Sequence, residues 1–345
     1  MSWAVAPFLF NGRPVSLQAS HRPALDAAVL AADVWAYVEH HIRGLTTPEA
    51  ARAKFFWSQA ERFAASLRSE RYEASPLHLY YMMLNAAKAL ILIRDPAGSS
   101  QFRTHGLAYD LSLPAQSNSA HLPGNLHAKP AGVFVSLCAV MGDQPVNQPL
   151  EDLFGSVISI HRAYSTIRQA PRERFMPLSK PVRLFAFGDG RFVSEIANHV
   201  DLTEVRAALP TEWQTQSSPD WSDKGVQSTN SIALAKVGAN QAFTDFYTAI
   251  RRQVDVIVGR NGLYYYLRRS DTPPVAWSQI TLNYSIGLAL SSLARYHPDV
   301  LNDQYNSPNG WLIKEYLRIA PHQFLALIAA EITGRIIQTP YGDLS

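Results

Sequence analysis

The hydrophobic period of this 345-residue chain changes twice, and the change limits the folds that the chain can adopt. Apolar residues recur at helical spacing near the N-terminal end, the spacing becomes strand-like in the middle, and helical spacing returns towards the C-terminal end. We therefore predict a mainly α fold, in which two halves of a helical bundle flank a small insert that contains β-hairpins. Helices are expected at residues 24–43, 48–69, 76–93, 150–167, 279–296, 309–319 and 321–337.

This pattern also predicts a division of the chain. We expect an N-terminal helical region over residues 1–180, a small β-containing insert over residues 181–270, and a C-terminal helical region over residues 271–345 that packs on the first. Within the first region, residues 94–131 are expected to form a long irregular loop, because four prolines interrupt them. Glycine-containing turns predict two hairpins in the insert, at residues 188–190 and 260–262.

The composition is that of a globular protein with a substantial core. Hydrophobic residues make up 47% of the chain and charged residues 17%, and a formal net charge of +3 does not by itself argue for nucleic-acid binding. The single cysteine, Cys138, lies in an apolar run and is expected to be a core residue. One cysteine cannot form an internal disulfide, so we expect a cytoplasmic protein. No uninterrupted apolar stretch of membrane-spanning length exists, which predicts no membrane partner.

Several motifs of common enzyme classes are absent. The sequence has no P-loop, no dinucleotide-binding glycine pattern after a strand, no Gly-x-Ser-x-Gly elbow and no His-Glu-x-x-His. The three histidines of the expected irregular loop, His105, His121 and His127, do not match a familiar metal-ligand spacing. We therefore expect no metal and no cofactor.

A narrow polar stripe marks the helix that follows Pro76. His78, Tyr81, Asn85 and Lys88 share one face of an otherwise apolar helix. Polar groups in such surroundings need partners, so the stripe is either a structural hydrogen-bond network or one wall of a ligand site. On the helix over residues 279–296, a similar face ends at Arg295, whose guanidinium suits either the helix dipole or a bound anion.

Two further patterns suggest contact with RNA or another nucleic acid. Arg71 and His78 are spaced as in ribonucleases of the HEPN type, in which histidine moves a proton and arginine stabilises the charge on phosphorus. A proline-broken basic segment could instead follow a phosphate backbone, although a solvated linker is the more common explanation. Its cations are Arg168, Arg172, Arg174, Lys180 and Arg183.

Four stretches, in order along the chain, resemble the bacterial YaaC-like family. They are Tyr80–Ala89, Thr104–Leu107, Gly132–Phe134 followed by the expected helix from Leu150, and Leu290–Pro298. The resemblance implies a mostly helical cytoplasmic protein. None of the four stretches is a catalytic signature, so the resemblance implies little about chemistry.

The family-like stretches contribute four polar residues that are expected to meet at one site, Asn85, Lys88, His105 and Arg295. Three of them can carry a positive charge and none is acidic, which favours a phosphate or carboxylate ligand. The alternative is that nearby acids such as Asp95, Asp110 or Asp299 neutralise the set and leave a structural network. We therefore expect a binding or assembly component that engages nucleic acid, a nucleotide, a protein partner or a second copy of itself. The alternative is a metal-independent HEPN-like ribonuclease that uses Arg71 and His78.

Overall fold

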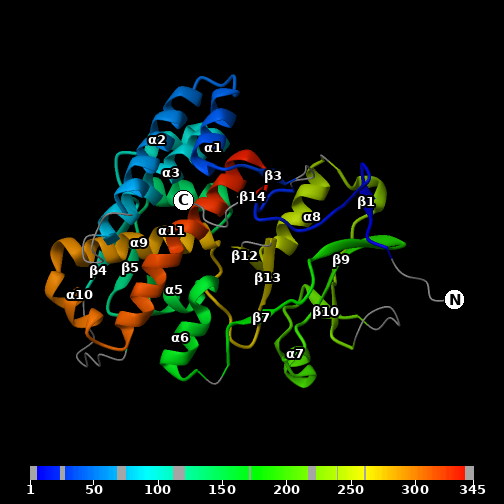
Figure 1. Ribbon diagram of the computed structural model, residues 1–345. Coiled ribbons are helices and arrows are strands. Elements are labelled where there is room, and N and C mark those ends of the chain that lie inside the picture. Colours follow the sequence, from blue (N-terminus) through cyan, green and yellow to red (C-terminus); the bar gives the residue numbers. More distant parts are fainter. Residues whose placement is uncertain are drawn as a thin grey trace. The chain divides into compact units, whose positions relative to one another are not determined.

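The computed structural model describes residues 6–23, 28–67, 75–111, 121–170, 172–216, 223–238, 240–259 and 262–338. These residues separate into two compact units (Figure 1). Unit 1 draws on Met1–Val29, Arg172–Pro274 and Gly334–Gln338, and unit 2 draws on Leu30–Pro171 and Val275–Thr333. Each unit is therefore assembled from segments that are far apart in the sequence.

Unit 2 is helical and is built around α3 (Ser75–Arg94). This helix is apolar on nearly every side, and it packs against α2, α4, α9 and α11. The other helices of the unit are α1 (Val34–Arg43), α2 (Ala50–Leu67), α4 (Val133–Met141), α5 (Leu150–Ser156), α6 (His161–Arg168), α9 (Gln279–Tyr296), α10 (Pro298–Tyr305) and α11 (Asn309–Thr333), with 3-10 turns η1 (Pro96–Gln101) and η2 (Ile158–Ile160).

The length and apolar composition of α3 would allow it to cross a membrane, and two thirds of its candidate window is buried inside the protein. The core helix of a soluble protein passes the same test, so the helix is weak evidence for a membrane span.

A small antiparallel sheet lies beside α9, whose residues pack against its first strand. Its strands are β4 (Leu107–Asp110), β5 (Asn125–Ala128) and β6 (Gln148–Pro149).

Unit 1 holds most of the strands. One antiparallel sheet has the order β10-β11-β9-β8 and another has the order β12-β13-β7, while β1 pairs with β2 and β14 pairs with β3. The strands are β1 (Leu9–Phe10), β2 (Arg13–Pro14), β3 (Val29–Leu30), β7 (Phe175–Pro177), β8 (Arg183–Phe187), β9 (Asp189–Glu195), β10 (Trp213–Thr215), β11 (Gly225–Ser228), β12 (Val254–Gly259), β13 (Gly262–Arg268) and β14 (Ile337–Gln338). The helices of this unit are α7 (Leu202–Ala208), the 3-10 turn η3 (Leu234–Lys236) and α8 (Gln241–Arg251).

The chain from β7 to β8 links the two larger sheets of unit 1. β7 pairs with β13, and the backbone N–H groups of Leu178 and Ser179 then donate to the carbonyl oxygens of Tyr265 and Glu195. After this crossing, β8 pairs with β9 through the expected hairpin around Gly188. One continuous segment therefore serves both sheets, which gives unit 1 a shared core.

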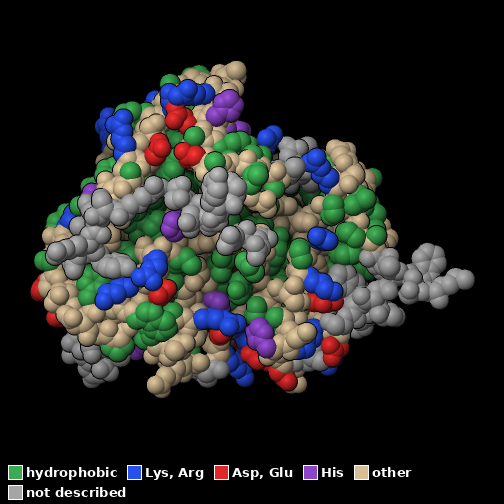
Figure 2. Space-filling view, in the orientation of Figure 1, with side chains coloured by type: hydrophobic (Ala, Val, Ile, Leu, Met, Phe, Trp, Pro, Cys, Tyr) green, Lys and Arg blue, Asp and Glu red, His purple; other side chains and the backbone are tan. Residues whose placement is uncertain are grey.

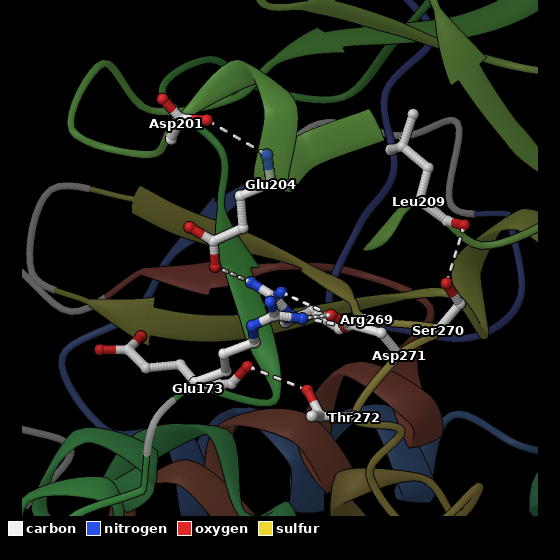
Figure 3. Close-up of polar contacts among 9 residues, drawn as sticks. Glu173, Asp201, Glu204, Leu209, Arg269, Ser270, Asp271 and Thr272 are labelled. Carbon is white, nitrogen blue, oxygen red and sulfur yellow. Dashed lines mark hydrogen bonds and ion pairs between the residues drawn. The ribbon is translucent and has the colours of Figure 1, made fainter. Parts of the chain in front are cut away.

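A buried ionic network fixes the end of β13 to neighbouring segments of unit 1 (Figure 3). The Arg269 guanidinium, 3% exposed, pairs with Glu204 of α7 and lies 2.8 Å from an Asp271 carboxylate oxygen. Arg172 lies 2.9 Å from the same oxygen. Hydrogen bonds from Arg269, with a further contribution from Arg172, lower the pKa of Asp271 to about 2. The network holds Asp271 ionised and is structural in character.

The prediction of a mainly α fold with one small β-containing insert is wrong. The protein is about 50% helical and 19% strand, and its described residues form five small sheets, so it is a mixed α/β protein. The error has a physical cause: the strands are two to seven residues long, too short for a clear alternating pattern. Two of them, β4 and β5, lie within the segment over residues 94–131 that prolines mark as irregular.

Candidate functional site

The apolar α3 helix supplies the base of the candidate site. Its N-terminal Pro76 suits the first helical turn, and Tyr80 in the second turn is fully buried. Of the predicted polar stripe, Tyr81 stacks on Phe63 with ring centroids 5.2 Å apart. The Asn85 side-chain amide donates to the Tyr81 carbonyl oxygen at 2.7 Å. Tyr81 and Asn85, in the middle of the stripe, thus find partners within the helical core. These contacts do not bring Asn85 to the other predicted ligand-binding residues.

Lys88 is the last member of the stripe, and its environment is unusual for a lysine. The ammonium nitrogen lies 5.1 Å from the ring centroid of Phe56 and 5.6 Å from that of Phe102. Both distances are within cation–π range. Partial burial lowers the pKa of Lys88 below its ordinary value. Among the described residues, no carboxylate lies within ion-pairing distance of this ammonium.

A close approach of two glycines fixes the backbone of His105. Gly106 and Gly132 have φ angles of 75° and 136°, and a Cβ atom added to Gly132 would lie 2.2 Å from the Gly106 nitrogen. The N–H of Phe134, at the start of α4, donates to the His105 carbonyl oxygen at 2.9 Å. Val133 N–H donates in the same way to Thr104. Two of the family-like stretches, Thr104–Leu107 and Gly132–Phe134, are therefore held together through their backbones. We call this contact the backbone clasp, and it sets the position of His105.

The imidazole of His105 lies against the buried Tyr80, which in turn contacts the buried Tyr284. Its Nδ1 atom is 2.6 Å from the Tyr80 hydroxyl oxygen, which is 3.4 Å from the hydroxyl of Tyr284 on α9. Burial raises the pKa of both tyrosines, so both hydroxyls keep their protons. With the Tyr80 hydroxyl donating to Nδ1, the proton of a neutral His105 is on Nε2, where it is available as a donor.

Arg295 completes the group from the last turn of α9. Its Nε donates to the Ser291 carbonyl oxygen at 3.2 Å, and its guanidinium carbon lies 5.0 Å from the ring centroid of Tyr296. The side chain is exposed, and no carboxylate of the described residues pairs with it. Partial burial lowers the pKa of His105, and the positive charges of Arg295 and Lys88 lower it further. The charges of Arg295 and Lys88 therefore both act on His105.

We call Lys88, His105 and Arg295 the cationic cluster. They come from α3, from the loop before β4 and from α9, and packing of β4 on α9 and of η1 on α3 brings these segments together in unit 2. The cluster offers hydrogen-bond donors and positive charge, and no acid in the described part of the chain pairs with Lys88 or Arg295, which suits anion binding. Among the described residues, no group of three or more His, Cys, Asp or Glu side chains could hold a metal ion.

Comparison with known proteins gives the family. The family model described as YaaC-like protein matches residues 34–332. The chain belongs to the YaaC-like family. No curated protein and no solved structure matches it. The matched range contains every residue of the cationic cluster, so the cluster lies within the family region of this YaaC-like protein.

The basic segment of the YaaC-like protein is largely neutralised. Arg168, in unit 2, makes a two-pronged pair with Glu151, with nitrogen–oxygen distances of 2.6 and 2.7 Å. In unit 1, Arg172 pairs with Asp271, Lys180 lies 2.9 Å from Glu195, and Arg174 also has an interaction. Arg183 has a buried Nε atom without a partner among the described residues. On the face shown in Figure 2, Lys and Arg side chains form separate small groups, several of them beside acids. This arrangement leaves little free charge for a phosphate backbone.

Of the two residues of the predicted ribonuclease pair, only His78 lies within the described part of the chain. Arg71 lies outside the described residues, and His78 on α3 has its ring centroid 6.0 Å from that of Phe63. The structure of the YaaC-like protein therefore gives no geometry for an Arg71–His78 pair. The residues that sequence reasoning missed are the aromatic ones around the cluster, Phe56, Phe102 and Tyr80, which interact through ring faces or a hydroxyl and carry no charge pattern to reveal them.

Proposed function

We propose that this YaaC-like protein is a binding component that holds a phosphate- or carboxylate-bearing ligand at the cationic cluster. One observation carries the proposal. Two basic side chains from distant segments, Lys88 and Arg295, both lie near enough to His105 to lower its pKa, and neither has a carboxylate partner among the described residues. Like charges repel, so this arrangement has an energetic cost that a bound anion would offset.

The chemistry of the cluster also sets the kind of ligand. A nucleotide, a nucleic-acid phosphate and an acidic segment of a protein partner all carry suitable anions. The lowered pKa of His105 favours its neutral form in the free protein at pH 7. A bound anion favours the protonated form, so His105 would add a third charge only when the ligand is present. The site therefore combines two fixed charges with one that responds to binding.

Removing either fixed charge should weaken anion binding. We expect Arg295→Gln and Lys88→Gln each to weaken the binding of inorganic phosphate by about tenfold or more, since each change removes a charge-assisted hydrogen bond. Isothermal titration calorimetry at low salt measures the effect. Arg295 is exposed, and within the described residues its contacts are with Ser291 of its own helix and with Tyr296, so its replacement should cost less than about 1 kcal/mol of stability.

Two matched controls separate a specific site from general attraction. Lys54 and Arg43 belong to the same unit, and both pair with Glu39 on the surface. Lys54→Gln and Arg43→Gln change the net charge equally and should leave phosphate binding unchanged. The proposal would be wrong if the native protein bound no phosphate, or if the control variants lost as much affinity as the cluster variants.

A further inference from the structure

An exposed aromatic ring stands directly beside the cationic cluster. Tyr296, the last residue of α9, is 67% exposed and is the most exposed aromatic side chain among those that the structure describes. Isolated apolar groups on a surface are common, so the exposure alone carries no argument. The position of Tyr296 is informative, because its ring contacts the guanidinium of Arg295, a member of the cluster.

The contact leaves part of the ring available. The Arg295 guanidinium carbon lies 5.0 Å from the ring centroid, so it covers one face. Tyr296 is 67% exposed, so ring surface remains for a ligand to contact. A flat group that packs against the exposed part of the ring is next to the segment that carries Arg295, so an anion attached to it through a short linker is directed towards the cluster. Nucleotides have this layout, with a planar base joined through a sugar to phosphate.

We propose that the ligand of the cationic cluster is a nucleoside phosphate, whose base stacks on Tyr296 while its phosphate binds Lys88, His105 and Arg295. This inference rests on the anion site proposed above, and it assigns the ligand class. Stacking of bases on aromatic side chains tolerates any base, because every base has a π face. The same chemistry is presented by a free nucleotide and by a nucleotide within single-stranded nucleic acid.

Calorimetry on the full chain with three probes tests the inference: adenosine 5′-monophosphate, ribose 5-phosphate and inorganic phosphate. The native protein should bind the nucleotide about tenfold more tightly than ribose 5-phosphate, a gain typical of one stacked base. Tyr296→Leu should abolish this difference and leave ribose 5-phosphate binding unchanged, whereas Tyr296→Phe should retain the difference. Trp311→Leu removes another exposed aromatic ring of unit 2 and should change neither affinity.

The outcomes distinguish the two proposals. Equal binding of nucleotide and ribose 5-phosphate by the native protein would overturn the nucleoside assignment and leave the anion site in place. Failure of all three probes to bind would remove the anion site itself. Loss of ribose 5-phosphate binding in Tyr296→Leu would also overturn the assignment, because Tyr296 would then only support Arg295. If the nucleotide preference is found, a short oligoadenylate that binds more tightly than the mononucleotide identifies single-stranded nucleic acid as the source, and equal affinity identifies the free nucleotide.

Discussion

Replacing Gly132 with alanine is expected to destabilise unit 2 by about 4 kcal/mol. A Cβ atom at this position would lie 2.2 Å from the backbone nitrogen and 2.3 Å from the Cα atom of Gly106, and backbone atoms cannot rotate away as a side chain can. The φ angle of 136° adds strain, because residues with a Cβ atom rarely adopt it. Urea unfolding measures the loss. Because the same clasp holds His105, the variant should also bind phosphate more weakly under folding conditions.

The matched control is Gly44→Ala in the same unit. Gly44 has an ordinary φ angle of −77°, and an added Cβ atom would meet its nearest neighbour at 3.4 Å, an ordinary contact distance. This change should alter stability by less than about 1 kcal/mol. If Gly132→Ala were as stable as Gly44→Ala, the described approach of the two glycine-containing segments would be incorrect.

Replacing Arg251 with methionine is expected to destabilise unit 1 by about 4 kcal/mol, because it leaves three backbone carbonyl groups without donors. The side chain is 1% exposed. Its Nε donates to the Gln18 carbonyl oxygen at 2.8 Å, its second terminal nitrogen donates to Ala19 at 3.0 Å, and its first donates to Val254. Urea unfolding measures the loss, and hydrogen exchange should show faster exchange in residues 15–21.

The neighbouring Arg252 provides the control. It is exposed, so Arg252→Met should change the free energy of unfolding by less than about 1 kcal/mol. Equal stability of the two variants would mean that Arg251 does not hold the N-terminal segment. Tyr247 and Tyr265 also bond to this segment, through Gln18 N–H and the Leu17 carbonyl, so the segment should loosen without full release.

Long apolar helices were predictable from the sequence, and their interruptions were not. The helices α3 and α9 follow their hydrophobic patterns closely. Two helices were expected on either side of residue 320, yet α11 continues through Pro321 because Leu317, Ala320 and Phe324 are buried around it. Tertiary packing there outweighs the hydrogen bond that proline cannot make.

The opposite error occurred after residue 150. One helix was expected, but the chain becomes extended at Val157, with ψ of 111°, between α5 and η2. The Gln279 side chain accepts from the Ile158 N–H at 3.1 Å and donates to the Ser156 carbonyl oxygen at 3.1 Å. A side chain more than 100 residues away thus replaces the helical partners. No local pattern reveals such a contact, and the same holds for β7, which pairs with residues 266–268.

The charged residues of the candidate site were predictable from the sequence. The residues that hold them in place were not. Lys88, His105 and Arg295 stand out because each lies beside apolar sequence, where an unpaired charge is costly. The aromatic contacts of Lys88 and the bond of His105 to Tyr80 depend on packing between segments. The role of Gly132 also appears only when Gly106 lies against it.

Titration of the His105 imidazole by NMR spectroscopy, with and without sulfate, tests the anion site most directly. Sulfate keeps its charge over the relevant range, so only the protein titrates, and His105→Gln assigns the signal. In the free protein, the pKa of His105 should lie below its ordinary value, and Arg295→Gln should raise it by removing a nearby positive charge. Sulfate should raise the pKa in the native protein, since an anion favours the protonated ring, and sulfate should accordingly bind more tightly as the pH falls. A His105 pKa that is not lowered in the free protein and does not respond to sulfate would contradict the cationic cluster as a binding site.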